Sequence, residues 1–436
     1  MTLVRGSVIF YFVATVAAMA SVPPPTFNKD IAPVIFQNCA DCHRPGEVAP
    51  FSLLDYQDVK KHAATIVKVT QRHVMPPWKA EKGFGEFHDA RFLSEEQIAL
   101  FKNWKEAGMP EGNAVDLPAP PKFTEGWMLG KPDLVCKPAE SYTLEAEGRD
   151  VYRCFVIPSQ YAEDRYVAAV EVRPGNRAIV HHVIAYLDTS GKARELDAAD
   201  SGPGYGTFGG VGFLPSGSLG GWAPGNFPRL LPDSIGVLLP KGADIVLQVH
   251  YHKTGKVETD QTRIGLYFCR GPVDKRQRVF PLSSRNLNIP PGDTNFTVRA
   301  SLPILFDVSV HAIMPHMHLI GKEMAVVATL PDGSTRPLIK IPDWDFNWQN
   351  TYRFKEPVPL PRGSRVDLVA RYDNSSDNAR NPSHPPQWVR RGEETTNEMC
   401  IAFLYYTVEI EHLTQGKTVT GFPDTFGGGR RQESKQ

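Results

Sequence analysis

The spacing of hydrophobic positions changes once along the chain, near residue 112. Before that point, apolar residues recur every three to four positions, and in residues 55–72 they are Val59, Ala63, Ile66 and Val67. This spacing is typical of an amphipathic helix. A second helix is predicted to begin after Ser94, because Ser94-Glu95-Glu96-Gln97 is a capping pattern followed by Ile98, Leu100, Phe101 and Trp104. Residues 24–112 are therefore expected to form a small all-α domain.

Beyond this point the pattern becomes one of short alternating runs, rich in β-branched and aromatic residues and separated by Gly, Pro, Asn and Asp. Clear examples are residues 166–172, 243–249 and 365–372. Such runs predict strands of antiparallel sheets. About 300 residues are too many for one sandwich, so we divide the region near Gly271-Pro272-Val273-Asp274. The predicted fold is a small helical domain followed by two all-β sandwich domains.

The boundaries follow from local breaks in the pattern. Gly108 to Gly112 ends the helical part, and Leu117-Pro118-Ala119-Pro120-Pro121 marks a stiff linker over residues 113–126. The two sandwiches are expected at 127–274 and 275–425, with a disordered tail at 426–436.

Residues 1–20 have the pattern of a secretory signal peptide. Arg5 precedes an apolar run at residues 8–17, and Ala18-Met19-Ala20 is a small-x-small cleavage pattern. The apolar run is too short to span a bilayer. We therefore expect export to the periplasm of a bacterium and no membrane span in the mature form; a retained membrane anchor is the alternative.

The charges are balanced, with 48 basic and 48 acidic residues in 436. A nucleic-acid-binding protein would need a basic excess on one face, so that class is excluded. Small molecules or redox proteins are the expected partners.

Cys39-Ala40-Asp41-Cys42-His43 is a c-type haem attachment motif. Cys39 and Cys42 would bind the haem covalently, and His43 would supply the proximal nitrogen. Met75, 32 residues further on, is the favoured sixth ligand, because a thioether is a common axial partner; His73, Met109 and an open site are the alternatives. A chance match or a redox dithiol is disfavoured by the signal peptide and the helical context.

Four further cysteines remain of the six: Cys136, Cys154, Cys269 and Cys400. In an oxidising compartment they suggest two disulfides, in any of three pairings. The alternative is one disulfide and two buried thiols.

Histidines and one methionine form a series of possible metal ligands. His316 and His318 would share one face of a strand, and Met399 from another strand would complete a site of two imidazoles and a thioether, which prefers Cu(I). His181 and His182 are adjacent, so an ideal strand would direct them apart, and a third ligand would have to be His250 or His252. Taken singly, each histidine is better explained as an ordinary hydrogen-bonded residue; their order and spacing favour metal binding.

That order resembles the copper type II, ascorbate-dependent monooxygenases over roughly residues 130–415. The matching motifs are His181-His182, Gln248-Val249-His250-Tyr251, His316-Met317-His318 with Gly321, and Glu398-Met399-Cys400, together with Trp222-Ala223 and Ile289-Pro290-Pro291-Gly292. The resemblance implies two jelly-roll-like sandwiches, each with one copper, and a solvent-filled cleft between them.

The resemblance also implies a role for each ligand. His181, His182 and His250 would hold the electron-supplying copper, and His252 would be a neighbour. His316, His318 and Met399 would hold the catalytic copper that binds dioxygen and abstracts hydrogen from the substrate.

Three positions depart from the peptide-amidating branch of the family. This chain has Met314, Ile401 and Phe403 where that branch has arginine, asparagine and tyrosine. A carboxylate clamp is therefore missing, which favours a less polar substrate. Cys400 also has no cysteine at the upstream position where the family has its disulfide partner.

The N-terminal region resembles a different family, the small methionine-ligated c-type cytochromes.

The sequence thus predicts a copper-dependent monooxygenase that hydroxylates an activated C–H bond of a small organic substrate with dioxygen. Its cofactors would be two copper ions and one covalently bound haem c, with electrons from ascorbate or a periplasmic donor passing through the haem. The alternatives are a non-catalytic periplasmic electron-transfer or copper-binding protein and, with less support, a carbohydrate-binding sandwich with an appended cytochrome.

Overall fold

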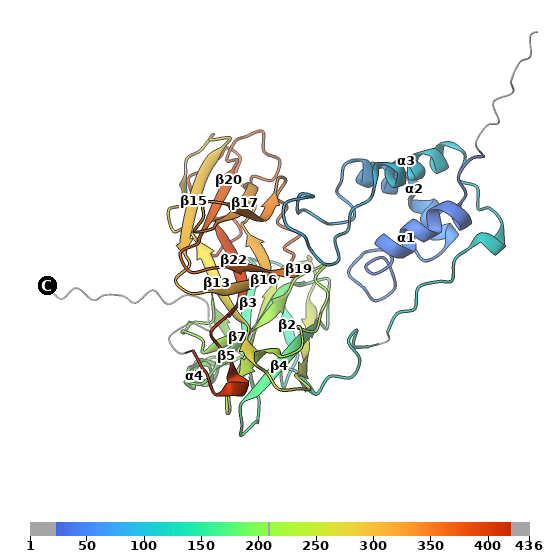
Figure 1. The fold of residues 1–436 in the computed structure, drawn as a ribbon. Coiled ribbons are helices and arrows are strands. Elements are labelled where there is room, and N and C mark those ends of the chain that lie inside the picture. The colour runs from blue at the N-terminus through green and yellow to red at the C-terminus, as the bar shows by residue number, and fades with distance from the viewer. Residues whose placement is uncertain (1–22, 125, 208–209, 420–436) are drawn as a thin grey trace, which may run out of the picture.

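The computed structural model describes residues 23–124, 126–207 and 210–419, and most of the regular structure in them is β (Figure 1). The signal-peptide segment 1–20 and the tail 426–436 lie outside the described residues. None of the helices in the described part of the chain is long and apolar enough to cross a membrane.

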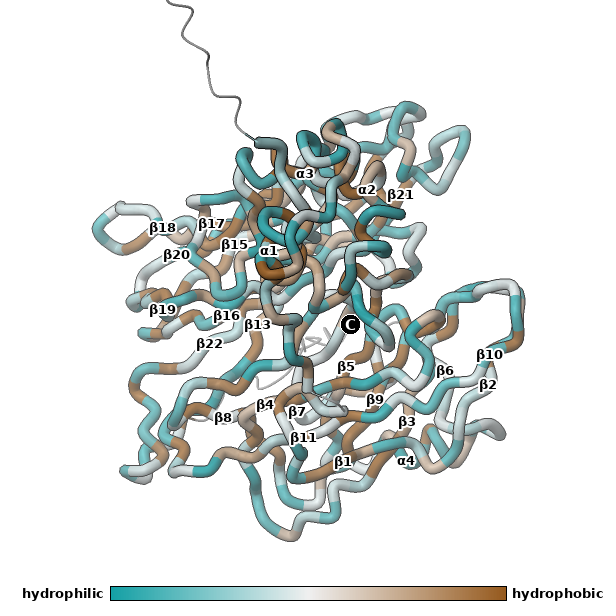
Figure 2. Tube along the Cα trace, turned by 90° about the vertical axis from the view of Figure 1, so that its right-hand side faces the viewer, coloured by the Kyte–Doolittle hydropathy of each residue, from teal (hydrophilic) through white to brown (hydrophobic). Residues whose placement is uncertain are grey.

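The helices of the N-terminal part gather on one side of the molecule, and Figure 2 looks onto this side. They are η1 (Phe27–Ile31), α1 (Ala32–Asn38), α2 (Tyr56–Gln71) and α3 (Glu95–Glu106). Asp55 caps α2, and Ser94 with Gln97 forms the capping box of α3, so both predicted helices are confirmed. Their apolar faces meet in one cluster that includes Phe27, Ile35, Val59, Phe101 and Trp104.

Two five-stranded sheets follow, packed face to face around one core. Their strand orders are β1-β11-β4-β8-β12 and β6-β3-β9-β5-β7, antiparallel except for the pairing of β12 with β8. The first consists of β1 (Leu134–Cys136), β11 (Arg263–Phe268), β4 (Arg165–Arg173), β8 (Ile235–Leu239) and β12 (Lys275–Arg276). The second consists of β6 (Tyr205–Thr207), β3 (Val151–Pro158), β9 (Asp244–Tyr251), β5 (Val180–Asp188) and β7 (Gly217–Trp222). We call this pair the first β unit; β2 (Tyr142–Leu144), β10 (Glu258–Asp260) and α4 (Lys192–Ala199) lie at its edges.

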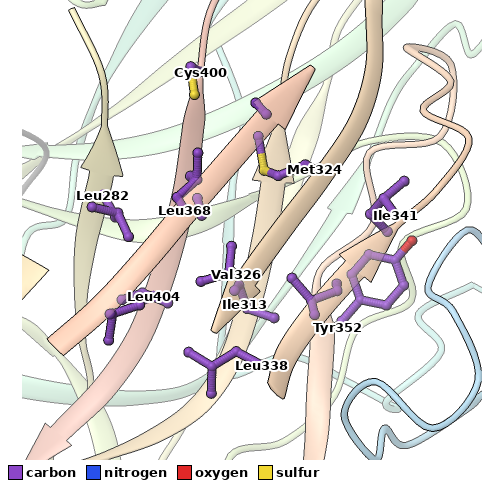
Figure 3. Packing of buried hydrophobic residues seen from close by; sticks show 14 of the residues in the cluster. Leu282, Ile313, Met324, Val326, Leu338, Ile341, Tyr352, Leu368, Cys400 and Leu404 are labelled. Atoms are coloured by element: carbon purple, nitrogen blue, oxygen red, sulfur yellow. The ribbon is translucent and has the colours of Figure 1, made fainter. Parts of the chain in front are cut away.

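Two four-stranded antiparallel sheets form the second β unit. Their orders are β13-β22-β16-β19 and β15-β20-β17-β18. The strands are β13 (Arg278–Ser283), β22 (Ile401–Val408), β16 (Val308–His316), β19 (Tyr352–Leu360), β15 (Phe296–Pro303), β20 (Arg365–Tyr372), β17 (Gly321–Thr329) and β18 (Thr335–Ile341), with a separate pair β14 (Asn288–Ile289) and β21 (Val389–Arg390) and a short η3 (Leu413–Gln415). Figure 3 shows the core between these sheets, including Ile313, Met324, Leu368 and Leu404. Antiparallel sheets that share a core are consistent with the predicted sandwiches.

The segment that follows α2 packs against the second β unit. Phe87 forms a β-bridge with Phe354, and the Trp78 ring lies edge-on to Tyr352 with centroids 5.0 Å apart. The helical part also meets the first β unit through an ion pair of 2.5 Å between Glu47 and Arg177. The helices are therefore held by contacts to both β units.

The prediction of two disulfides is wrong. All six cysteines lie within the described residues and all are free. Cys136, Cys154 and Cys400 are buried in three separate clusters of apolar side chains, while Cys269 is half-buried just beyond β11. Strands that belong to different layers keep these thiols apart, and burial raises the pKa of Cys136, Cys154 and Cys400 to about 11.

Candidate metal centres

The first centre consists of His181, His182 and His250, on the neighbouring strands β5 and β9. His182 pairs directly with His250, and the register shifts between Val180 and His182. Such a bulge places an extra residue on one strand and redirects its side chain. It explains how two adjacent histidines approach a common point, which an ideal strand would prevent.

The ring nitrogens of this centre have the spacing of metal ligands. One nitrogen from each of His181, His182 and His250 lies within 4.8 Å of the others. The Nδ1 atom of His182 is 3.2 Å from that of His181 and 3.4 Å from that of His250. Tetrahedral ligands about 2.0 Å from an ion would be separated by about 3.3 Å. The three rings therefore fit a single metal ion.

Asp150 and Tyr152 orient His250 from outside the centre. The Nε2 atom of His250 is 2.9 Å from the Asp150 carboxylate, which can only accept, so Nε2 carries the proton and Nδ1 is left for the metal. The Tyr152 ring stacks on His250 at 4.2 Å. Burial alone would raise the pKa of the Asp150 carboxyl, but the hydrogen bond and charge of His250 hold it below its usual value.

We expect Asp150→Ala to lower the copper affinity of the first centre about 10- to 100-fold, because outer partners of this kind fix the tautomer of a ligand histidine. Competition with a chromophoric copper chelator measures the affinity. Asp150→Asn keeps an acceptor oxygen and should lose less, and Asp233→Ala, an exposed aspartate of the same β unit, is the control. Wild-type affinity in Asp150→Ala would show that His250 needs no such partner.

The second centre begins at the end of β16. The rings of His316 and His318 are 5.1 Å apart, within the 4.8–5.5 Å that separates the rings of the first centre. The Nδ1 of His316 donates to the side-chain oxygen of Gln349 at 2.6 Å, and the Nδ1 of His318 donates to the carbonyl of Asn397 at 3.1 Å. Both Nε2 atoms are therefore unprotonated and available to a metal.

Met399 reaches the same end of the sheet through the pairing of β16 with β22. His316 pairs with Ile401, two residues after Met399, and the Met399 side chain is buried. The two imidazoles and the thioether are a donor set that suits Cu(I).

Glu398 ties the two ligand segments of this centre together. Its fully buried carboxylate accepts backbone N–H bonds from His318, Ile320 and Met399, at 2.8, 2.9 and 3.1 Å. Burial raises the pKa of this carboxyl to about 8, against the effect of these donors. One carboxylate therefore fixes the backbone at His318 and at Met399.

Burial keeps His181, His182, His316 and His318 neutral. It lowers the pKa of His181 and of His318 to about 3, and also lowers that of His182 and of His316. A neutral imidazole has a free lone pair, so these rings are ready for metal at neutral pH.

Phe346 lies between the two centres. Its ring stacks on His181 with centroids 5.0 Å apart and planes at 18°, and it meets the ring of His318 edge-on at 5.8 Å and 80°. One phenyl ring thus contacts a histidine of each candidate centre; the solvent-filled cleft that the resemblance implies stays a prediction.

His252 lies outside the first centre. Its ring is 6.5 Å from that of His181, and its buried Nδ1 has no hydrogen-bond partner among the described residues. It is absent from the group of nitrogens that lie within bridging distance of one ion.

The predicted haem-binding residues lie at the turn after α1. Cys42 and His43 donate backbone N–H bonds to the carbonyl of Cys39, and the Nδ1 of His43 donates to the carbonyl of Phe51 at 3.1 Å, which leaves Nε2 for iron. Burial raises the pKa of Cys39 to about 12 and also raises that of Cys42. Both therefore stay protonated at neutral pH, unlike the nucleophile of a redox dithiol.

The candidates for the sixth haem ligand lie in different parts of the helical region and differ in burial. Met109 packs against the same helical cluster as Cys39. Met75 begins the segment that runs to the second β unit, and His73 is exposed. The choice among them stays a prediction.

One family model matches the part of the chain that contains the second centre. Residues 277–419 match the model of the copper type II ascorbate-dependent monooxygenase family, C-terminal domain. That stretch contains His316, His318 and Met399.

Two mammalian proteins match more of the chain. The human "Putative DBH-like monooxygenase protein 2" is 24% identical over 295 residues, which cover 60% of this chain and 54% of that protein. The mouse "DBH-like monooxygenase protein 2" is 24% identical over 272 residues, covering 57% of this chain and 40% of the mouse protein. The chain thus spans about half the length of these relatives.

Among solved structures, one titled "Structure of PNGF-II in P21 space group" covers 62% of this chain and 65% of that chain at 10% identity, with a TM-score of 0.28. The sequence matches support the copper type II monooxygenase family for this chain, and the match over residues 277–419 is the main support. That family implies copper as the metal.

Proposed function

We propose that this protein is a copper-dependent monooxygenase that hydroxylates an activated C–H bond of a small organic substrate. The observation that carries the proposal is a pair of unlike candidate donor sets, each with one histidine in contact with the Phe346 ring. Three ring nitrogens form one, and the neighbouring imidazoles of His316 and His318, with the buried Met399 as the proposed third donor, form the other. Copper bound to these residues would supply one-electron redox chemistry and the activation of dioxygen.

The residues of the first centre are suited to electron transfer. His181, His182 and His250 offer three nitrogens of one kind, and His250 is held by Asp150 and Tyr152. A centre with fixed ligands reorganises little when it gains or loses an electron. We therefore assign the electron-supplying role to it.

The residues of the second centre are suited to catalysis. Copper held by His316, His318 and Met399 would have only three protein ligands and could take up dioxygen. Phe403 lies near His316, with ring centroids 6.5 Å apart, and the neighbouring Met314 and Ile401 carry no charge. This surrounding favours an apolar C–H bond over a carboxylate-bearing substrate.

We further propose that the N-terminal part is a c-type cytochrome with Cys39, Cys42, His43 and Met75 as the haem ligands. The Glu47–Arg177 ion pair supports this arrangement, because it holds the turn after the haem motif against the segment that leads into His181. A tethered donor has a high effective concentration at its acceptor. Electrons would come from ascorbate or a periplasmic donor, in an exported protein whose two β units are jelly-roll-like.

The test is oxygen uptake coupled to product. Purified protein with two coppers and a reductant should incorporate one atom of ¹⁸O₂ into a substrate found by screening small apolar molecules. A chelator should abolish the activity, and copper but not zinc should restore it. If the coppers cycle between oxidation states while no substrate is hydroxylated, the protein is the non-catalytic electron-transfer or copper-binding alternative.

A further inference from the structure

The loop of residues 345–351, between β18 and β19, contacts all three parts of the chain. Asn226 of the first β unit donates its side-chain N–H to the Gln349 carbonyl at 3.2 Å and accepts the Thr351 N–H at 3.1 Å. Asn350, which is buried, donates to the carbonyl of Pro77 in the segment after α2, at 3.1 Å. The position of this loop is therefore fixed from several sides.

The same loop contacts both metal centres. Phe346 stacks on His181 and meets His318 edge-on. Gln349 accepts from His316 through Oε1 and donates through Nε2 to the carbonyl of Phe346 at 3.0 Å. One loop thus contacts a ligand of the first centre and both histidines of the second.

Two features of Phe346 suit it to hold the centres apart at a fixed distance. A ring that is stacked on one partner and edge-on to another has a defined orientation, since both geometries are favourable for aromatic pairs. The ring is also apolar, so it occupies the space between His181 and His318 without offering hydrogen bonds to water. Neither property depends on the metal.

We propose that Phe346 is a positioning residue that sets the spacing of the two centres and excludes water from the direct line between His181 and His318. The inference about what this spacing serves rests on the proposed monooxygenase function. A fixed, dry separation would keep the path of electrons between the two centres short.

The first test needs no metal. In the full-length, metal-free protein, diethyl pyrocarbonate modifies accessible neutral imidazoles, and peptide mass mapping gives a rate for each. Phe346→Ala should raise the rates at His181 and His318 several-fold. His311, which lies on β16 and bonds to Thr407, should be unchanged, and Phe346→Tyr should restore the wild-type rates.

Phe346→Leu is a second variant in case Phe346→Ala does not fold, because leucine keeps most of the apolar volume without the ring. It should give intermediate modification rates at His181 and His318. Wild-type rates at His181 and His318 in both Phe346→Ala and Phe346→Leu would overturn the proposal. A rise at His311 as well would mean general loosening, and would overturn it equally.

The second test uses protein loaded with two Cu(II) ions. Dipolar broadening in the EPR spectrum reports their separation, and we expect it to change in Phe346→Ala and to be preserved in Phe346→Tyr. Phe306→Leu, an exposed phenylalanine before β16, is the control. An unchanged spectrum in Phe346→Ala contradicts the proposal. Lack of hydroxylase activity would contradict the proposed function but not the role of Phe346. If the protein does not bind two coppers, the diethyl pyrocarbonate rates of the first test decide whether Phe346 has this role.

Discussion

Replacing Glu398 by alanine is expected to lower the free energy of unfolding by about 3 kcal/mol. The change leaves the backbone N–H groups of His318, Ile320 and Met399 without their acceptor in a fully buried position. Each unsatisfied buried donor costs about 1–3 kcal/mol. Burying a carboxyl whose pKa is raised to about 8 is itself unfavourable. Removing this carboxyl therefore offsets part of the cost of the three unsatisfied donors, and we expect the lower end of their summed cost.

Urea unfolding of the metal-free protein measures this effect. Glu394→Ala is the matched control, because Glu394 lies in the same loop and its side chain makes only exposed contacts, an ion pair with Arg149 at 3.3 Å and a hydrogen bond accepted from the Thr396 hydroxyl at 3.4 Å; it should change stability by less than about 1 kcal/mol. Glu398→Gln keeps the shape and one acceptor oxygen, so it should fall between. Equal stability of Glu398→Ala and Glu394→Ala would show that the three donors find other partners.

The secondary structure near the sites was largely predictable because it depends on local patterns. The spacing of Val59, Ala63 and Ile66 gives α2, and the short run rich in β-branched residues at 243–249 gives β9, all of whose residues are buried. The bulge at His181 was not predictable, since it is a property of the pairing between β5 and β9 and not of either strand alone. The error over disulfides has a similar origin, because the layer in which a cysteine lies depends on the tertiary fold.

The candidate ligand histidines could be selected from the sequence because they are chemically distinctive and occur in compact motifs. Their partners could not. Asp150 lies 100 positions from His250, and Gln349 lies 33 positions from His316, in segments with no unusual local pattern. Glu398 was part of a recognised motif, and its position as a charged residue three places before the apolar strand β22 was the one local signal of its structural role. Phe346 had no local signal.

Met399→Leu is expected to reduce hydroxylation at least about 100-fold while the protein stays folded. Losing an outer partner of a metal ligand already costs about 10- to 100-fold in affinity or activity, and this change removes a ligand itself. Leucine is preferred to alanine because Met→Ala in a buried position costs about 2–5 kcal/mol through the cavity it leaves, whereas leucine nearly conserves volume.

X-ray absorption of the Cu(I) form gives a readout that does not depend on activity: the sulfur scatterer should disappear in Met399→Leu and remain in Met324→Leu. Met324 is the matched control, because it is a fully buried methionine in the core of the same β unit and is not assigned as a metal ligand. If Met399→Leu hydroxylates substrate at the wild-type rate, the thioether is not a ligand that catalysis needs, and the assignment of the second centre as the oxygen site fails. If the sulfur signal disappears while both coppers remain bound, the loss of activity is caused by the donor set and not by loss of the metal.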